Sequence, residues 1–236
     1  MNKMKLIFDI GFNVGEFTQT CFDTYKDCNV IAVEANPNLC NSSIRSCFSG
    51  NNFTLLNNLV SNNEDEEINF YISHNATGVS TASMEFMINS RFTKGSKNLS
   101  KNSINWAKPI KVKSITVDSM IENYGMPDLI KIDVEGYELN VIRGLTKKAK
   151  DICFEWHEEE YENLIKILDH LQNIGYEEFG IIGWFDEGDV FEKATFSDKG
   201  DPYLEYPNFF YKRTELEVEK LINPERRVNY GMFFAK

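Results

Sequence analysis

The amino-acid sequence predicts one α/β domain built on an open, doubly wound sheet of about seven mostly parallel strands. Short apolar runs alternate with amphipathic stretches along most of the chain, which is typical of repeated βαβ units. Acidic side chains follow several of these runs, at the ends where an open parallel sheet binds its ligands. The length of 236 residues suits a single domain spanning residues 1–236.

The first 60 residues predict three strands and two helices. Apolar runs at residues 5–10, 29–34 and 53–60 predict the strands. Between the first two strands, apolar side chains recur at helical spacing over residues 14–25, directly after a glycine turn. Asn36 supplies the N-cap of a second helix whose first turn begins with proline.

The second half of the chain continues the alternation. Four apolar runs predict strands, at residues 128–134, 152–156, 178–183 and 230–235. An apolar stripe over residues 161–174 predicts a helix, which Gly175 ends at its C′ position.

Charge and cysteine content exclude several classes of protein. Twenty-five basic and 36 acidic side chains give a net charge of −11, which repels nucleic acid and an anionic membrane surface. The apolar stretch near the N-terminus is too short for a signal-peptide core, and no segment is long enough to span a bilayer. The five cysteines include no Cys-x-x-Cys pair, which argues against disulfides and structural zinc. We therefore expect a cytoplasmic protein that acts on a small molecule or glycan.

Two segments interrupt the regular pattern. Residues 91–113 carry seven basic side chains and no acidic one, and a solvated loop is the simplest explanation. Residues 184–229 contain nine aromatic side chains, too many for a plain connection. We expect both segments to shape an acceptor site, because aromatic rings pack on sugars and lysines attract acidic or phosphorylated groups.

Residues 9–15 predict a turn that binds a nucleotide-like cofactor. Gly11 and Gly15 have no Cβ, so backbone N–H groups can approach a ligand closely at a helix N-terminus. Asn13 stands where a dinucleotide-binding turn has its second glycine. Glu34, 23 residues after Gly11, ends the second strand and can accept hydrogen bonds from both ribose hydroxyls. Asp9 would repel a pyrophosphate but suits the ammonium and sulfonium groups of S-adenosylmethionine; a role in capping the turn is the alternative.

Three motifs resemble, in order and spacing, those of the FkbM family of S-adenosylmethionine-dependent methyltransferases: residues 8–18 (FDIGFNVGEFT), 33–37 (VEANP) and 128–138 (DLIKIDVEGYE). The resemblance implies a Rossmann-like methyltransferase fold with an antiparallel last strand. It also implies O-methylation of sugar or polyketide-type hydroxyls, with Ala35 beside Glu34 at the cofactor. The segment 184–229 departs from the family by its length, so the resemblance does not identify the acceptor.

The third motif also carries charged side chains into a strand. Alternation along residues 130–135 puts Lys131, Asp133 and Glu135 on one side. Asp133 and Glu135 would reach the ligand edge, with Lys131 one step deeper. For Lys131, an ion pair with Asp9 or Glu135 that only fixes the strand register is an equal alternative.

The next strand adds Glu155 and His157, which share a face. His157 can act as the general base that takes the acceptor proton. Alternatively, Asp133, Glu155 and His157 hold one Mg²⁺ or Mn²⁺ that polarises the hydroxyl. A third possibility is that His157 is a surface residue at the start of an acidic run.

The leading hypothesis is an S-adenosylmethionine-dependent O-methyltransferase with Asp133, Glu155 and His157 as its catalytic residues. A non-catalytic module that binds the cofactor and a ligand is the main alternative. A nicotinamide-dependent oxidoreductase is a third candidate, which Asp9 and the missing glycine disfavour.

Overall fold

The structure is a computed structural model that describes residues 4–90, 92, 104–185, 207, 210–216, 218 and 229–236. Its helices and strands, in chain order, are β1 (Leu6–Ile10), α1 (Glu16–Thr24), β2 (Asn29–Val33), the 3-10 turn η1 (Pro37–Leu39), α2 (Ser42–Cys47), β3 (Asn52–Leu56), β4 (Leu59–Val60), β5 (Glu67–Phe70), the 3-10 turn η2 (Thr77–Val79), α3 (Met84–Asn89), β6 (Ile110–Ile115), α4 (Val117–Tyr124), β7 (Leu129–Ile132), α5 (Glu138–Arg143), β8 (Asp151–His157), the 3-10 turn η3 (Glu158–Glu160), α6 (Tyr161–Asn173), β9 (Glu178–Phe185), β10 (Tyr211–Lys212), the 3-10 turn η4 (Arg213–Glu215) and β11 (Asn229–Ala235).

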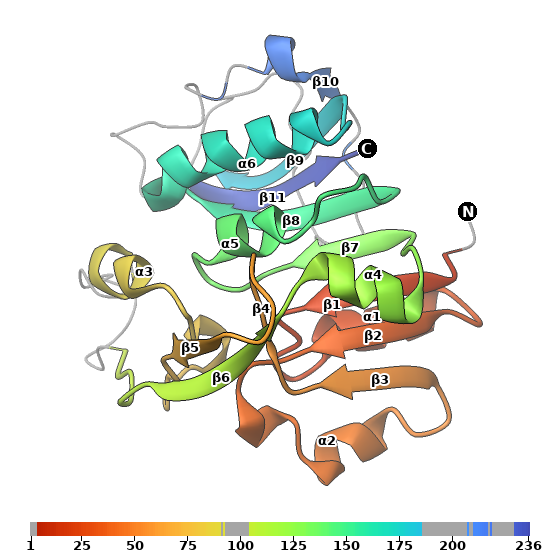
Figure 1. Ribbon diagram of the computed structural model, residues 1–236, viewed down its shortest axis with the longest axis vertical. Helices are drawn as coiled ribbons and strands as arrows, with labels where there is room; N and C mark the ends of the chain where they lie inside the picture. Colours follow the sequence, from red (N-terminus) through yellow and green to blue (C-terminus); the bar gives the residue numbers. More distant parts are fainter. Residues whose placement is uncertain are drawn as a thin grey trace.

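In the described part of the chain, eight strands form one sheet in the order β10-β9-β11-β8-β7-β1-β2-β3 (Figure 1). Strands β3, β2, β1, β7 and β8 are parallel, and β11 runs antiparallel to both β8 and β9. The predicted Rossmann-like fold with an antiparallel last strand is confirmed. The strand order reverses between β1 and β7, and such a reversal opens a crevice at the carboxyl ends of the strands.

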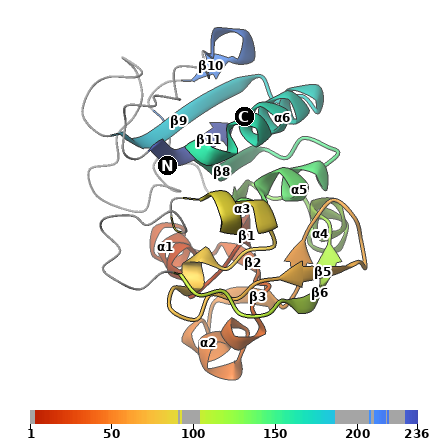
Figure 2. The same ribbon diagram turned by 90° about the vertical axis from the view of Figure 1, so that its left-hand side faces the viewer.

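Helices cover both faces of the sheet. Figures 1 and 2 show α4, α5 and α6 on one face and α1 on the other. The core follows the same division, since Ile130 and Ile132 of β7 pack with the first group and Leu129 packs with the α1 side. Burying such a side chain contributes about 1.5–3 kcal/mol to stability, which explains why β7 is apolar on both faces apart from Lys131.

Two predicted elements are divided in the structure. The strand predicted at residues 53–60 breaks after β3, because Asn57 Nδ2 turns back to donate to the backbone oxygen of Glu34 at 2.9 Å. The helix predicted after Asn36 is only the 3-10 turn η1, and a second cap at Asn41 then starts α2. The prediction that Gly175 ends the helix α6 is confirmed, with Gly175 at a φ of +105°.

A second, small sheet was not expected from the sequence. Its described strands have the order β4-β6-β5, with β4 parallel and β5 antiparallel to β6. It lies with α3 at the carboxyl edge of the parallel strands (Figure 1). The sheet therefore helps to enclose the region where the fold places its ligands.

Part of the sequence lies outside the described residues. This applies to residues 91 and 93–103 of the basic segment and to most of the insertion 184–229, so their roles at the acceptor site stay predictions. The last four residues of the basic segment, 110–113, belong to β6. Among the described residues, none of the helices combines the length and the apolar character that crossing a bilayer would require.

Candidate functional site

The glycine turn between β1 and α1 depends on two left-handed glycines. Gly11 has a φ of +84°, and a Cβ there would lie 1.7 Å from the backbone oxygen of Asp133. Gly15 has a φ of +88°, and a Cβ there would lie 2.6 Å from the Phe12 ring and 2.7 Å from the Phe48 ring. The two glycines thus let the turn pack tightly against the end of β7 and against the aromatic cluster behind it.

The Glu34 carboxylate ties this turn to the end of β2. Its Oε2 accepts a hydrogen bond from the Asn13 backbone N–H at 2.7 Å, and its Oε1 accepts one from the Asn36 backbone N–H at 2.7 Å. Glu34 is 7% exposed, and this burial raises its pKa although the two N–H donors oppose the shift. Each carboxylate oxygen keeps a lone pair that can accept a further hydrogen bond.

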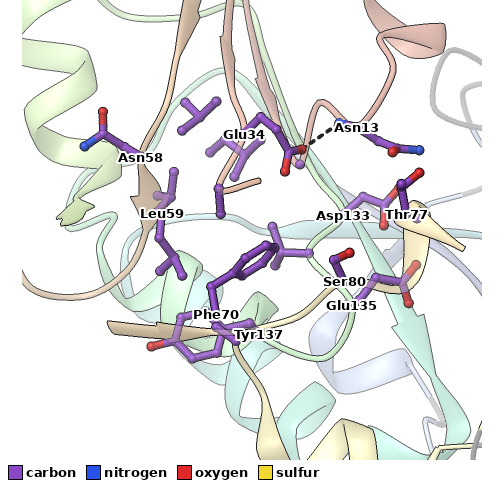
Figure 3. A pocket seen from close by; sticks show the side chains of 18 residues that line it. Asn13, Glu34, Asn58, Leu59, Phe70, Thr77, Ser80, Asp133, Glu135 and Tyr137 are labelled. Carbon is purple, nitrogen blue, oxygen red and sulfur yellow. Dashed lines mark hydrogen bonds between the residues drawn. The ribbon is translucent and has the colours of Figure 1, made fainter. Parts of the chain in front are cut away.

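A cavity opens beside Glu34 at the carboxyl edge of the sheet (Figure 3). Its apolar lining is Ile10, Val33, Ala35, Leu59, Val60, Phe70, Ala82 and Val134. Its other lining residues are Gly11, Asn13, Glu34, Asn58, Thr77, Gly78, Ser80, Asp133, Glu135 and Tyr137. An apolar wall with a few convergent polar groups is typical of a small-molecule site.

The predicted cofactor residues divide into two groups. Gly11, Asn13, Glu34 and Ala35 line the cavity, whereas Asp9 and Gly15 do not. Asn13 Oδ1 is buried and has no hydrogen-bond partner among the described residues. A buried acceptor without a donor is costly, so this atom fits a ligand that brings an N–H or O–H group. The residues present therefore fit S-adenosylmethionine, which carries an ammonium group and two ribose hydroxyls.

Asp9 lies beneath the turn and is paired with Lys131. Its Oδ1 accepts from Lys131 Nζ at 3.2 Å and its Oδ2 from Thr18 Oγ1 at 2.6 Å. Burial raises the pKa of Asp9, although Lys131 and Thr18 oppose the shift. Burial alone would lower the pKa of Lys131, but the carboxylates of Asp9 and Asp133 hold it above its ordinary value. Lys131 Nζ also donates to the Gly11 oxygen at 2.7 Å, so the pair supports the turn from below.

The chain leaves β7 through an unusual turn. Glu135 adopts a φ of +55° and Gly136 a φ of +84°, and a Cβ on Gly136 would lie 2.7 Å from Phe86 Cβ. Thr81 Oγ1 donates to the Glu135 backbone oxygen at 2.6 Å, which fixes the turn to the loop before α3. The strand alternation predicted for residues 130–135 therefore stops before Glu135.

This turn changes the membership of the predicted catalytic cluster. His157 Nε2 lies 3.1 Å from Glu155 Oε2 and 3.8 Å from Glu135 Oε2. In the described part of the chain, the group of potential metal ligands found here is Glu135, Glu155 and His157. Asp133 is not part of it; its Oδ2 lies 3.6 Å from Lys131 Nζ and the residue lines the cavity. The structure thus brings Glu135, and not the predicted Asp133, together with Glu155 and His157, because the left-handed turn at Glu135 carries its carboxylate toward His157; the metal stays a prediction.

Neighbouring carboxylates make this cluster electrostatically unusual. Burial and the negative charges of Glu155 and Asp133 raise the pKa of Glu135 well above its ordinary range. Burial likewise raises the pKa of Glu138 to about 8, with His157 opposing the shift. His157 is buried, and the centre of its ring lies 5.5 Å from that of Phe86. It is therefore not a surface residue at the start of an acidic run, which was one of the alternatives predicted from the sequence.

Several cavity residues were not identified from the sequence. Thr77 and Ser80 come from the loop around η2, and Asn58 follows the break after β3. Such loop positions have no periodic pattern. Glu135 was placed at the ligand edge but not assigned a role, although its acidic side chain in a glycine-containing turn was the available signal.

Comparison with known proteins identifies the domain. The family model described as "Methyltransferase FkbM domain" matches residues 9–178. No curated protein matches the chain. Among solved structures, the chain is similar to precorrin-6y C5,15-methyltransferase from Geobacter metallireducens GS-15, with 11% identity, a TM-score of 0.47, and coverage of 100% of this chain and 81% of that chain. Because the family match spans well over half of its residues and contains both the glycine turn and Glu34, the chain belongs to the FkbM methyltransferase family.

Proposed function

We propose that this protein transfers the methyl group of S-adenosylmethionine to a hydroxyl of a carbohydrate or another small polar acceptor in the cytoplasm. One observation carries the proposal above all: the buried carboxylate of Glu34 lines a cavity at the carboxyl end of β2. A carboxylate at this position is suited to both ribose hydroxyls and disfavours a 2′-phosphate. The family supports methyl transfer as the reaction class.

The cavity suggests an orientation for the cofactor. We place the ribose on Glu34 and the adenine against the apolar wall that includes Leu59 and Phe70. The unpartnered Asn13 Oδ1 is then available to the ammonium group. Asp133 and Glu135 line the same cavity (Figure 3), so we assign the methyl-bearing end of the cofactor to their part of its wall.

A hydroxyl acceptor suits the groups at that wall. Methyl transfer needs the acceptor oxygen in line with the sulfonium methyl and a group that offsets the hydroxyl proton. We assign that task to Asp133, which lines the cavity, and to Glu155 and His157, which act through Glu135.

Binding and turnover together test the proposal. We expect S-adenosylhomocysteine to bind in a calorimetric titration while NAD does not. Radiolabelled S-adenosylmethionine should then label at least one member of a panel of sugars and glycans, with a mass shift of one methyl group. Binding without transfer to any hydroxyl compound would support the non-catalytic module instead. Saturable binding of NAD in place of S-adenosylhomocysteine would support the oxidoreductase.

A further inference from the structure

Three potential metal ligands meet beside the cofactor cavity. Glu135 comes from the turn after β7, and Glu155 and His157 come from the end of the neighbouring strand β8. One ligand atom of each lies within 4.8 Å of the others. Two carboxylates and one imidazole, brought together from separate chain segments, form a mixed donor set rather than a surface group of acids.

The separations agree with coordination of one cation. Ligands held about 2.0–2.2 Å from a common metal at angles near 90–109° lie about 2.8–3.6 Å from each other. His157 Nε2 is 3.1 Å from Glu155 Oε2, inside that range. It is 3.8 Å from Glu135 Oε2, slightly outside that range, and the two carboxylates lie within 4.8 Å of each other, so the ligands would have to draw closer together around a bound cation.

Glu135 provides a second and independent observation. Its Oε2 is buried, and among the described residues it has no hydrogen-bond partner. The backbone that carries it is fixed by the 2.6 Å hydrogen bond from Thr81 to the Glu135 carbonyl oxygen. His157 Nε2, at 3.8 Å, is too far away to donate a hydrogen bond to this oxygen, and a cation bound between the three side chains would supply the missing partner.

We infer that Glu135, Glu155 and His157 bind one divalent cation at the wall of the cofactor cavity. The donor set suits Mn²⁺ better than Mg²⁺, because Mg²⁺ prefers oxygen ligands and imidazole suits transition metals. The role of the cation depends on the proposed function: since Glu135 lines the cavity, the cation lies where it lowers the pKa of the acceptor hydroxyl. The binding itself does not depend on that function.

Mn²⁺ titration of the chelator-treated protein tests the site without turnover. Electron paramagnetic resonance of free Mn²⁺ should show one saturable site per chain. Glu135→Gln and Glu155→Gln should each weaken binding about tenfold or more, as expected when the coordination sphere of a metal is altered. Glu159→Gln, in the exposed part of the neighbouring acidic run, is the matched control and should bind Mn²⁺ like wild type.

A spectroscopic measurement on the wild-type protein covers the case in which a variant fails to fold. Electron spin echo envelope modulation should reveal the ¹⁴N coupling of one imidazole to the bound Mn²⁺. This coupling should be absent in His157→Gln. Absence of saturable binding, or binding without a nitrogen coupling, would overturn the inference and leave a His157–Glu155 hydrogen bond in its place. Titration of the chelator-treated protein with S-adenosylhomocysteine keeps the two proposals separate, because the cofactor is assigned to Glu34 and Asn13 and the cation to Glu135, Glu155 and His157.

Discussion

Removal of the Lys131 ammonium should be among the most destabilising single changes in this chain. Lys131 is 3% exposed and lies 3.2 Å from Asp9, which is fully buried. Breaking a buried ion pair by removing one partner costs about 3–5 kcal/mol, because the other charge is left uncompensated. In Lys131→Met, Asp9 would keep the Thr18 hydroxyl as a donor, and the Gly11 oxygen would lose its 2.7 Å donor.

Urea unfolding followed by circular dichroism measures this cost. We expect Lys131→Met to lose about 3–5 kcal/mol of unfolding free energy. The double variant Lys131→Met/Asp9→Asn should lose less than the sum of the two single variants, because it buries no unpaired charge. Lys150→Met is the matched control: its 3.4 Å ion pair with Asp128 is partly exposed, and its loss should cost about 0–1 kcal/mol.

Two results would refute this reasoning. One is a loss of less than about 1 kcal/mol of unfolding free energy in Lys131→Met, since that is the loss expected for a surface ion pair. The other is strict additivity of the two single losses in the double variant.

The Asp9→Asn variant also tests the position of Asp9 relative to the cofactor. Because Asp9 lies under the turn, Asp9→Asn should weaken S-adenosylmethionine binding less than Glu34→Ala does; the opposite order would support the direct contact predicted from the sequence.

Three further predictions concern the turn and the buried acids. Gly11→Ala places a Cβ 1.7 Å from the backbone oxygen of Asp133, so it should lower the melting temperature far more than Gly50→Ala does. Gly50 is the matched control because its φ is also positive but nothing lies within 4 Å of its Cβ position; equal shifts in melting temperature would contradict the packing described. Asn13→Gly keeps a residue that tolerates the φ of +49° but removes Oδ1. Because that oxygen is assigned to the charged ammonium group, S-adenosylmethionine affinity should fall about tenfold or more, and unchanged affinity in calorimetry would exclude this contact. Burial raises the pKa of Glu138 from 4.5 to about 8, so the folded chain holds a proton there that the unfolded chain releases. Stability should therefore fall as pH rises from about 5 to about 8, by up to about 1.4 kcal/mol per unit, and a slope that persists in Glu138→Gln would assign it to other groups.

The sequence predicted the elements whose pattern is set by burial on both faces. Strand β7 and its neighbour β1 could be predicted from their runs of apolar residues, because helices cover both sides of the sheet and bury both faces of these strands. The end of α6 was predicted because Gly175 is a residue that adopts the left-handed conformation readily. The small sheet was missed for the opposite reason: β6 alternates apolar residues with lysines inside a basic segment, and its pairing with β4 and β5 depends on contacts distant in sequence.

At the site, the residues placed correctly from the sequence are those that follow directly from a strand end. Glu34, Asn13 and Asp133 line the cavity as their positions implied. The residue placed differently lies where the backbone departs from regular geometry. The alternation was extended to Glu135, but the left-handed turn carries that carboxylate to His157 instead. A non-glycine residue with positive φ is held by its tertiary contacts, here the Thr81 hydrogen bond, which no local pattern reveals.

Cofactor binding by Glu34→Ala is the decisive measurement for a cofactor site built on the Glu34 carboxylate. Loss of a hydrogen bond to a charged group costs about 1.5–3 kcal/mol, so the dissociation constant for S-adenosylmethionine should rise roughly tenfold to 150-fold. Calorimetry compares the dissociation constants of wild type, folded Glu34→Ala and Glu122→Ala, in which the replaced glutamate is exposed and serves as the control. An affinity within about twofold of wild type in a folded Glu34→Ala protein would remove Glu34 from the site and contradict the assignment of this cavity to the cofactor.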